Sequence, residues 1–264
     1  MDIYTLEHGH TPLLVSLPHD GTHIPEALRE RMWPSAHTAP DTDWHVAQLY
    51  AFARELGASI LCPSHSRYVV DLNRPPDDAS LYPCQNTTGL CPTVQFSGEP
   101  IYRDGQAPDA AEIDERRRLY WQPYHNALET ELARLRTRFG RVVLWDGHSI
   151  RGELPYLFEG RLPDLNLGTA SGHSCSPGLQ ARLTTVLEQQ DRYRHAVNGR
   201  FKGGYITRHY GAPEQGIEAI QLELAQSTYM DEASGQYLPE RAQILQEIVL
   251  RPLLETALAA VGDA

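Results

Sequence analysis

Residues 141–149 read RVVLWDGHS, an apolar run that ends in an acidic residue, a glycine and a histidine. A short continuous apolar run of this kind is typical of a buried strand. We predict a central strand over 141–146, followed at once by His148. In open α/β sheets ligands bind beyond the carboxyl ends of the strands, so polar residues that follow such strands are the first candidates for a functional site.

Further strands and helices alternate on both sides of this run. Apolar runs predict strands over 13–17, 58–62, 68–72 and 217–224, and helical spacing predicts helices over 44–56, 109–138 and 177–190 and from about Pro239. This alternation is typical of a three-layer α/β fold, with a mostly parallel mixed sheet and helices on both faces. We predict one domain over 1–264, with long active-site loops near 75–108 and 147–176.

The composition argues against several classes of protein. The chain has 264 residues, 41% of them hydrophobic, which is enough for a sizeable core. Its net charge is −11, whereas a nucleic-acid-binding protein would normally carry a basic patch. No apolar run approaches the roughly 20 residues that span a membrane, and the N-terminus lacks the pattern of a signal peptide. We therefore expect a cytoplasmic protein with no nucleic-acid or membrane partner; the sequence does not indicate its oligomeric state.

The four cysteines are Cys62, Cys84, Cys91 and Cys175. None of them stands in a C-x-x-C pair, so a structural zinc knuckle is not indicated. In a reducing compartment they are interpreted as free thiols, most of them packed in the interior.

Two histidines follow predicted strands in the same way. His19 comes after 13–17, and His148 comes after 141–146. Imidazole is the commonest metal ligand, and 12 histidines are many for a chain of this length. A lone histidine in such a place is more often structural, but two that leave core strands in the same way favour a shared metal ion.

The third ligand of such a site would be a carboxylate. Zinc hydrolases commonly use two histidines and one carboxylate and leave a fourth position for water. Asp43 is our first choice and Asp41 the second, although either could simply cap the helix that follows. Asp20 and Asp146 are further candidates. Zinc, iron or manganese would suit this set, and zinc is the default for hydrolysis.

Glu223 is the candidate general base. It lies inside the apolar run 217–224, where alternation places it on the same face as Gln221. A buried carboxylate is costly unless it is paired or takes part in chemistry. Burial would raise its pKa, which suits a group that accepts and returns a proton near neutral pH.

A dense polar cluster surrounds the predicted strand 68–72. Its members are Arg67, Asp71, Asn73 and Arg74. A surface salt bridge would account for one pair, but four such residues within eight positions are dense for that explanation. Asn73 and Arg74 are candidates to bind a substrate carboxylate, because such a pair can hold one in a planar fork.

The chain resembles the N-formylglutamate amidohydrolases in stretches that span most of its length in order. They are LVSLPHDGTHIP at 14–25, DTDWHVAQLY at 41–50, SRYVVDLNRPP at 66–76, LWDGHSIRGELPYLFEGRLPDLNLGT at 144–169, NGRFKGGYITRHYGAP at 198–213 and IQLELAQSTYM at 220–230. That family is distantly similar to the zinc carboxypeptidases and aspartoacylases, which implies a fold of the zinc-carboxypeptidase (phosphorylase/hydrolase-like) type.

Those distant relatives use a His-x-x-Glu pair, a later histidine, an Asn-Arg pair for the substrate carboxylate and a glutamate base on a late strand. The residues that match in order and type are His19, Asn73, Arg74, His148 and Glu223. Thr22 stands where the ligand glutamate would be, so the third ligand must come from elsewhere.

The resemblance implies an amidohydrolase that uses one divalent metal ion, by default zinc. The reaction would be hydrolysis of N-formyl-L-glutamate to formate and L-glutamate, the last step of a histidine degradation route. Arg67 and the metal would stabilise the oxyanion. The second substrate carboxylate needs another cation, for which Arg208 is the first choice, with Arg200 and Lys202 behind it.

Two other interpretations remain open from the sequence. One is another N-acyl amino acid hydrolase, of the desuccinylase or aspartoacylase type, because no residue pattern measures the acyl pocket. The other is a carboxylate-binding protein without catalysis, which would use the arginines but leave Glu223 and the two histidines unexplained. In each case the partner is a small-molecule acidic amino acid derivative.

Overall fold

The computed structural model describes residues 1–80 and 88–262. Within these ranges seven strands form one sheet, in the order β1-β3-β2-β4-β7-β5-β6. The pairs β1/β3 and β5/β7 are antiparallel and the other neighbours are parallel, so the predicted mostly parallel mixed sheet is confirmed. The strands are β1 (Tyr4–Glu7), β2 (Leu13–Ser16), β3 (Ser59–Pro63), β4 (Val142–Ile150), β5 (Leu165–Gly168), β6 (His195–Val197) and β7 (Ile217–Ala225).

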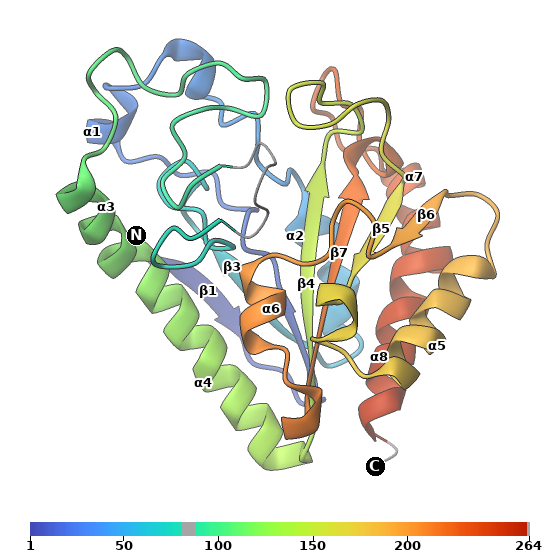
Figure 1. Cartoon of the computed structure of the whole chain (residues 1–264). Helices are drawn as coiled ribbons and strands as arrows, with labels where there is room; N and C mark the ends of the chain where they lie inside the picture. The colour runs from blue at the N-terminus through green and yellow to red at the C-terminus, as the bar shows by residue number, and fades with distance from the viewer. Residues whose placement is uncertain (81–87, 263–264) are drawn as a thin grey trace.

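Helices lie on both faces of this sheet, which gives the predicted three-layer α/β fold (Figure 1). The α-helices of the described chain are α1 (Glu26–Arg29), α2 (Val46–Leu49), α3 (Ala110–Arg116), α4 (Gln122–Phe139), α5 (Pro177–Glu188), α6 (Tyr205–Tyr210), α7 (Pro239–Leu245) and α8 (Arg251–Gly262). Two π turns, η3 (Arg117–Trp121) and η7 (Gln246–Leu250), join α3 to α4 and α7 to α8.

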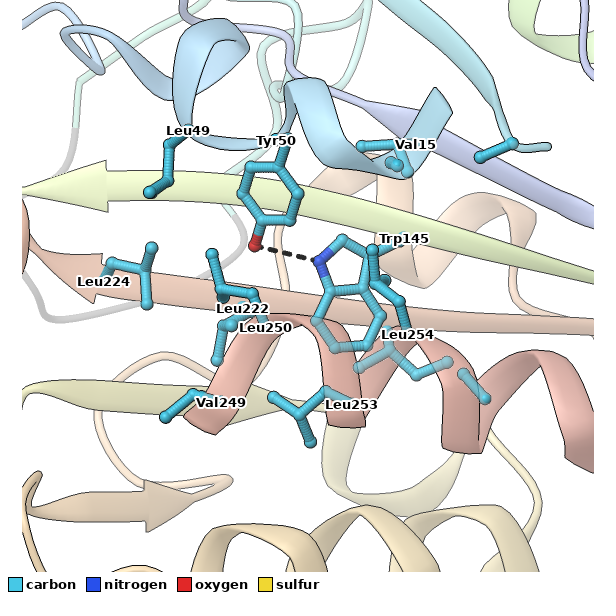
Figure 2. Packing of buried hydrophobic residues seen from close by; sticks show 14 of the residues in the cluster. Val15, Leu49, Tyr50, Trp145, Leu222, Leu224, Val249, Leu250, Leu253 and Leu254 are labelled. Carbon is cyan, nitrogen blue, oxygen red and sulfur yellow. Dashed lines mark hydrogen bonds between the residues drawn. The ribbon is translucent and has the colours of Figure 1, made fainter. Parts of the chain in front are cut away.

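Strands β4 and β7 form the centre of the sheet. Every residue of β4 is buried, and β4 pairs with β7 along its whole length. On one face Trp145 packs among leucines of β7 and α8, and its indole Nε1 donates to the Tyr50 hydroxyl at 3.0 Å (Figure 2). Burying an aromatic side chain of this size contributes strongly to stability, and the bond satisfies its only polar atom.

The opposite face of the sheet is covered by the composite helix α3-η3-α4. Three of its side chains also bind backbone carbonyls of the loop 69–74, which follows β3. The donors are Arg116 Nη1 to Val69 O at 3.3 Å, His125 Nε2 to Leu72 O at 2.9 Å and Trp121 Nε1 to Arg74 O at 3.0 Å. The helix therefore fixes the backbone of the loop that carries Asn73 and Arg74.

The predicted strand over 68–72 is wrong. Its backbone makes turn-like bonds, from Val69 N to Ser66 O at 2.9 Å and from Arg74 N to Asp71 O at 3.3 Å. The apolar side chains of this stretch are nevertheless buried. The apolar pattern correctly indicated burial. It could not show that this backbone forms turns and, within the described residues, joins no strand of the sheet.

Three other predicted boundaries differ from the structure. The strand predicted over 141–146 continues to Ile150, so His148 lies within β4 and the irregular stretch predicted from 147 begins later and contains β5. The helix predicted over 44–56 is a four-residue α-helix followed by the 3-10 turn Ala51–Arg54. His45 before it has φ of 64°, outside the helical region, which delays the start of that helix.

Cys62, Cys91 and Cys175 are free thiols, and the last two are buried. Cys84 lies outside the described residues. No helix in the described part of the chain combines the length and the apolar character needed to cross a bilayer.

Candidate active site

The candidate site lies at the carboxyl ends of the central strands, where loops gather above the arrowheads of β4 and β7 (Figure 1). The register pairs Asp146 with Gln221 and His148 with Glu223. Because side chains alternate along a strand, these four project from the same face of the sheet. The apolar alternation of β4 and β7 thus fixes the direction of the polar residues at their ends.

Three predicted ligands meet at this edge. His19 in the loop after β2, Asp43 before α2 and His148 in β4 form a buried group whose candidate ligand atoms all lie within 4.8 Å of one another. Asp43 Oδ2 lies 3.0 Å from His148 Nδ1 and 3.7 Å from His19 Nδ1. Ligands at zinc distances in a tetrahedron are about 3.3 Å apart, so these separations fit a single ion. The group could hold a metal ion.

The chemistry of His19 supports this fit. Its Nε2 lies 2.7 Å from Asp71 Oδ1, and a carboxylate can only accept, so Nε2 carries the proton. In the neutral ring Nδ1 then presents a lone pair. This Nδ1 is buried, faces Asp43 and has no hydrogen-bond partner among residues 1–80 and 88–262. A buried acceptor atom that receives no hydrogen bond and faces a carboxylate is suited to bind a cation together with it.

His148 has a similar second partner. Its Nε2 lies 3.1 Å from Asp146 Oδ1 and 2.8 Å from Asn73 Nδ2, while Nδ1 faces Asp43. With the proton on Nδ1 the ring donates to Asp43 and accepts from Asn73. With the proton on Nε2 it donates to Asp146 and leaves Nδ1 free for a metal. Carboxylates behind ligating histidines fix the tautomer and the ring orientation in this way.

The other carboxylates considered as ligands have different partners. Asp20 Oδ1 accepts from Ala47 N at 2.9 Å, inside α2, and therefore serves that helix. Asp41 Oδ2 accepts from the Tyr68 hydroxyl at 2.7 Å and from Phe96 N at 2.8 Å. Asp146 Oδ2 accepts from Thr207 Oγ1 at 3.1 Å, and its other oxygen faces the side of His148 away from Asp43. Among the four, Asp43 is the one grouped with both histidines.

The buried charges at this edge favour a cation. Burial acts to raise the pKa of Asp43, but the His148 and His19 rings outweigh it and hold that pKa well below its usual range. Burial likewise opposes ionisation of Asp71, yet His19 and Arg67 lower the pKa of this carboxyl. The pKa of His148 is raised despite burial, because Asp146 and Asp43 stabilise its cationic form. The cluster thus stabilises positive charge at its centre.

Among the buried carboxylates at this edge, Glu223 has the weakest hydrogen bonding to its side chain. It is 7% exposed, and within the described residues its side chain accepts one hydrogen bond, a long one from Gln221 Nε2 at 3.4 Å. Burial raises its pKa to about 8, with Asp43 adding to the effect and the charges of His148 and Arg67 opposing it. A carboxyl group with such a pKa can exchange a proton near neutral pH.

Arg67 and Asn73 are both buried, and their side chains contact other residues of this cluster. The Arg67 guanidinium lies 2.7 Å from Asp71 Oδ2 and 3.5 Å from Asp43 Oδ1, so it neutralises buried acids. Asn73 Nδ2 contacts Asp146 and His148, and Asn73 Oδ1 accepts from Ile206 N at 2.7 Å. Asn73 thus braces His148 and α6, and it also lines the cavity at this edge.

A cavity of about 770 Å³, part of it open to solvent, contains this cluster. Its basic lining residues are Arg67, Arg74 and Arg200, and its apolar wall is formed by Phe96, Ile150, Leu157, Phe158 and Phe201. Arg208 and Lys202 are exposed and are not among the described residues that line it. The apolar wall was not predicted from the sequence, since all of it except Ile150 at the end of β4 comes from irregular segments that show no periodicity.

Comparison with known proteins places the chain among hydrolases. The family model described as N-formylglutamate amidohydrolase matches residues 11–230. An N-formylglutamate deformylase of Pseudomonas aeruginosa is 51% identical over 98% of this chain and 97% of that protein, and one of Pseudomonas putida is 50% identical over 97% and 96%. The crystal structure of an N-formylglutamate amidohydrolase from Ralstonia eutropha has a TM-score of 0.81 at 25% identity, covering 97% of this chain and 98% of its own.

Proposed function

Because the chain belongs to the N-formylglutamate amidohydrolase family, we propose that it hydrolyses N-formyl-L-glutamate to formate and L-glutamate. The observation that carries the proposal is the presence of Glu223 in the same cavity as the buried group of His19, Asp43 and His148. A base beside a potential metal site is the arrangement that hydrolysis of an unactivated amide requires.

His19, Asp43 and His148 would hold the metal ion, and Zn²⁺ is the ion we propose. When bound, such an ion polarises a carbonyl and lowers the pKa of water to roughly 7. Asp71 and Asp146 orient the two imidazoles from behind, so that each can present Nδ1 toward Asp43.

Glu223 moves the proton in this proposal. Its carboxylate accepts a proton from the attacking water, whose oxygen bonds to the formyl carbon. The same proton then passes to the glutamate nitrogen as the C–N bond breaks, which releases formic acid and the free amine. The acid gives up its remaining proton and becomes formate. A group that must both accept and return a proton works best with a pKa near the working pH, and the raised pKa of Glu223 agrees with this.

Arg67 and Arg74 supply the positive charge near the reacting groups. We propose that Arg67, buried beside Asp43, adds electrostatic stabilisation to the oxyanion through its charge. Arg74 binds the substrate α-carboxylate. Asn73 supports this contact by bracing His148 and the start of α6, at Ile206.

The same proposal covers the setting of the reaction. The free thiols of Cys62, Cys91 and Cys175 are consistent with a reducing compartment, and we propose that the enzyme works in the cytoplasm. Its product pair, formate and glutamate, fits the last step of a histidine degradation route.

The test compares three substrates that share glutamate and differ in the acyl group: formyl, acetyl and succinyl. Purified protein is assayed for release of free glutamate from each, and its bound metal is measured by elemental analysis. We expect about one equivalent of Zn²⁺ and a kcat/KM for the formyl substrate at least 100-fold above the others, because small differences in pocket fit are worth roughly 10- to 200-fold each.

Two results would contradict the proposal. Faster release from the acetyl or succinyl substrate would identify another N-acyl amino acid hydrolase. Binding of N-formylglutamate without release of glutamate, in protein loaded with metal, would identify a carboxylate-binding protein.

A further inference from the structure

We propose that Arg200, rather than Arg208, determines the preference for an acidic side chain by binding the second carboxylate of the substrate. This inference rests on the proposed function. It adds a specificity-determining residue, which discriminates between substrates that share the same scissile formamide.

The three arginines that line the cavity have different surroundings. Arg67 faces the buried acids Asp71 and Asp43. Arg74 lies 4.0 Å from Asp71 through Nε and donates to Thr88 Oγ1 at 3.3 Å, so it stands next to the cluster that would act on the amide. The α-carboxylate adjoins that amide in the substrate, and Arg74 is therefore the arginine suited to it.

Arg200 belongs to a different wall of the cavity. Its guanidinium carbon lies 5.1 Å from the centre of the Phe158 ring and 6.0 Å from that of Phe201, and Nη2 donates to Leu157 O at 2.5 Å. All four residues line the cavity. A guanidinium held against aromatic faces keeps its orientation, and a fixed planar fork binds a carboxylate with little loss of entropy.

This wall suits the side chain of glutamate. Its two methylene groups need apolar neighbours and its terminal carboxylate needs a cation beyond them. Leu157 and Phe158 provide the apolar surface, and Arg200 lies beside them. An amino acid with a neutral side chain would make no charge-assisted contact with Arg200, so it would bind less tightly than glutamate.

The loop that carries Arg200 is held at both ends. Before it, Asn198 Oδ1 accepts from Thr169 N at 2.9 Å, and Asn198 Nδ2 donates to Thr169 Oγ1 at 2.8 Å. After it, Gly204 N donates to the side chain of Gln221 at 2.7 Å. A binding group on a loop anchored in this way is positioned before the ligand arrives, as specificity requires.

Arg208 lies further along the same basic segment, residues 198–208, which also carries Arg200 and Lys202. It lies in α6, is exposed, and its Nε donates to Gly203 O at 2.8 Å. That bond supports the loop backbone next to Gly204. Arg208 is therefore the matched control for Arg200, because both are arginines of the same basic segment and only one lines the cavity.

The experiment uses the variants Arg200→Met, Arg200→Lys and Arg208→Met in the metal-loaded enzyme. Each is assayed with N-formylglutamate and with N-formylglutamine, which has the same shape but a neutral side chain. Arg200→Met should lower kcat/KM for N-formylglutamate by roughly 10- to 100-fold, the effect of losing a charge-assisted contact, while changing the glutamine substrate by less than about threefold. Arg200→Lys should retain an intermediate preference, and Arg208→Met should keep the wild-type ratio.

A binding measurement separates this inference from the proposed function. Titration calorimetry with glutarate and with its monoamide, glutaramate, needs no turnover. Wild type should bind glutarate at least about tenfold more tightly, and Arg200→Met should bind the two equally. Equal binding by the wild type, or an unchanged ratio in folded Arg200→Met or Arg200→Lys, would overturn the role of Arg200. A wild-type enzyme that discriminates in this titration but releases no formate would overturn only the proposed reaction.

Discussion

Two buried glutamates of the same strand, Glu218 and Glu223, are held in opposite ways. Glu218 near the start of β7 is 0% exposed; its Oε1 accepts from Arg141 Nη2 at 2.5 Å and its Oε2 from Ser176 N at 2.6 Å. Ser176 precedes α5, so this carboxylate also lies at a helix N-terminus, where negative charge is favoured. Glu223 at the far end of β7 has the long contact from Gln221 instead.

The difference shows how to distinguish a structural carboxylate from a reactive one. Both side chains are buried on the same strand, so burial alone does not separate them. Five positions along an alternating strand place them on opposite faces of the sheet. Glu218 is neutralised by a guanidinium, whereas burial raises the pKa of Glu223 despite the opposing charges of His148 and Arg67. A buried acid whose charge is only partly compensated is the one available for proton transfer.

The largest expected effect concerns turnover. Glu223→Gln should lower kcat by roughly 100- to 10,000-fold, the usual contribution of a general acid–base group, because the amide cannot accept the proton of water. Metal content should stay close to that of wild type. Steady-state kinetics and elemental analysis of the same preparation measure both quantities.

Glu218→Gln is the matched control for that experiment, as the same chemical change in the same strand. Its kcat per folded molecule should remain within about twofold of wild type, since Glu218 faces away from the cavity. Near-normal turnover in Glu223→Gln, or a large loss in Glu218→Gln, would reverse the assignment of the two residues.

The second prediction concerns stability. Glu218→Gln should lower the free energy of unfolding by about 2 kcal/mol, because it replaces two charge-assisted hydrogen bonds by weaker ones. The loss stays below that of a fully buried ion pair since the Arg141 side chain is 34% exposed and can be hydrated. Urea unfolding at pH 7 checks this value. A free energy unchanged within error would mean that Arg141 and Ser176 contribute little to the fold.

The last prediction concerns the pH dependence of stability, measured on metal-free protein. The pKa of Glu223 is raised from its ordinary value of 4.5 to about 8 in the folded state. Between these pH values the folded protein therefore keeps a proton on Glu223 that the unfolded chain has lost. Between these two values the unfolded chain holds fewer protons, and stability falls as pH rises. Glu223→Gln removes this loss, so the variant should gain on the order of 3 kcal/mol relative to wild type between pH 5 and pH 8.

Urea unfolding of both metal-free proteins at several pH values tests this relation. Glu218→Gln serves again as the comparison, because it should be less stable than wild type over the same range. Parallel curves for wild type and Glu223→Gln would show that Glu223 does not titrate in the folded protein.

The central part of the fold was predictable because its signals are strong. The runs 13–17, 58–62, 141–146 and 217–224 contain all of β2, most of β3 and β7, and part of β4. Strands β1, β5 and β6 were not predicted, since they have four, four and three residues, too few to show a period. The stretch 68–72 shows the opposite error, a predicted strand that is absent from the described structure. Its apolar side chains are buried, but its backbone forms turns.

The site was predictable only in its residue types. His19, His148 and Glu223 could be singled out because each is polar next to an apolar run. The choice among Asp20, Asp41, Asp43 and Asp146 depends on distances across the fold that sequence spacing does not contain. The place of Arg200 depends in the same way on Phe158 and Leu157, which come from a loop more than forty residues earlier.

The π turn between α3 and α4 sets a limit on insertions and deletions. Arg116, Trp121 and His125 bind carbonyls of the same loop, although Arg116 and Trp121 are five positions apart. In a regular α-helix five positions correspond to a rotation of about 140°, so both could not face that loop. The wider turn brings them to one side. Removing one residue here would break the hydrogen bond to Val69 or the one to Arg74. The length of this helix is therefore constrained by its contacts with the loop 69–74 rather than by the helix itself.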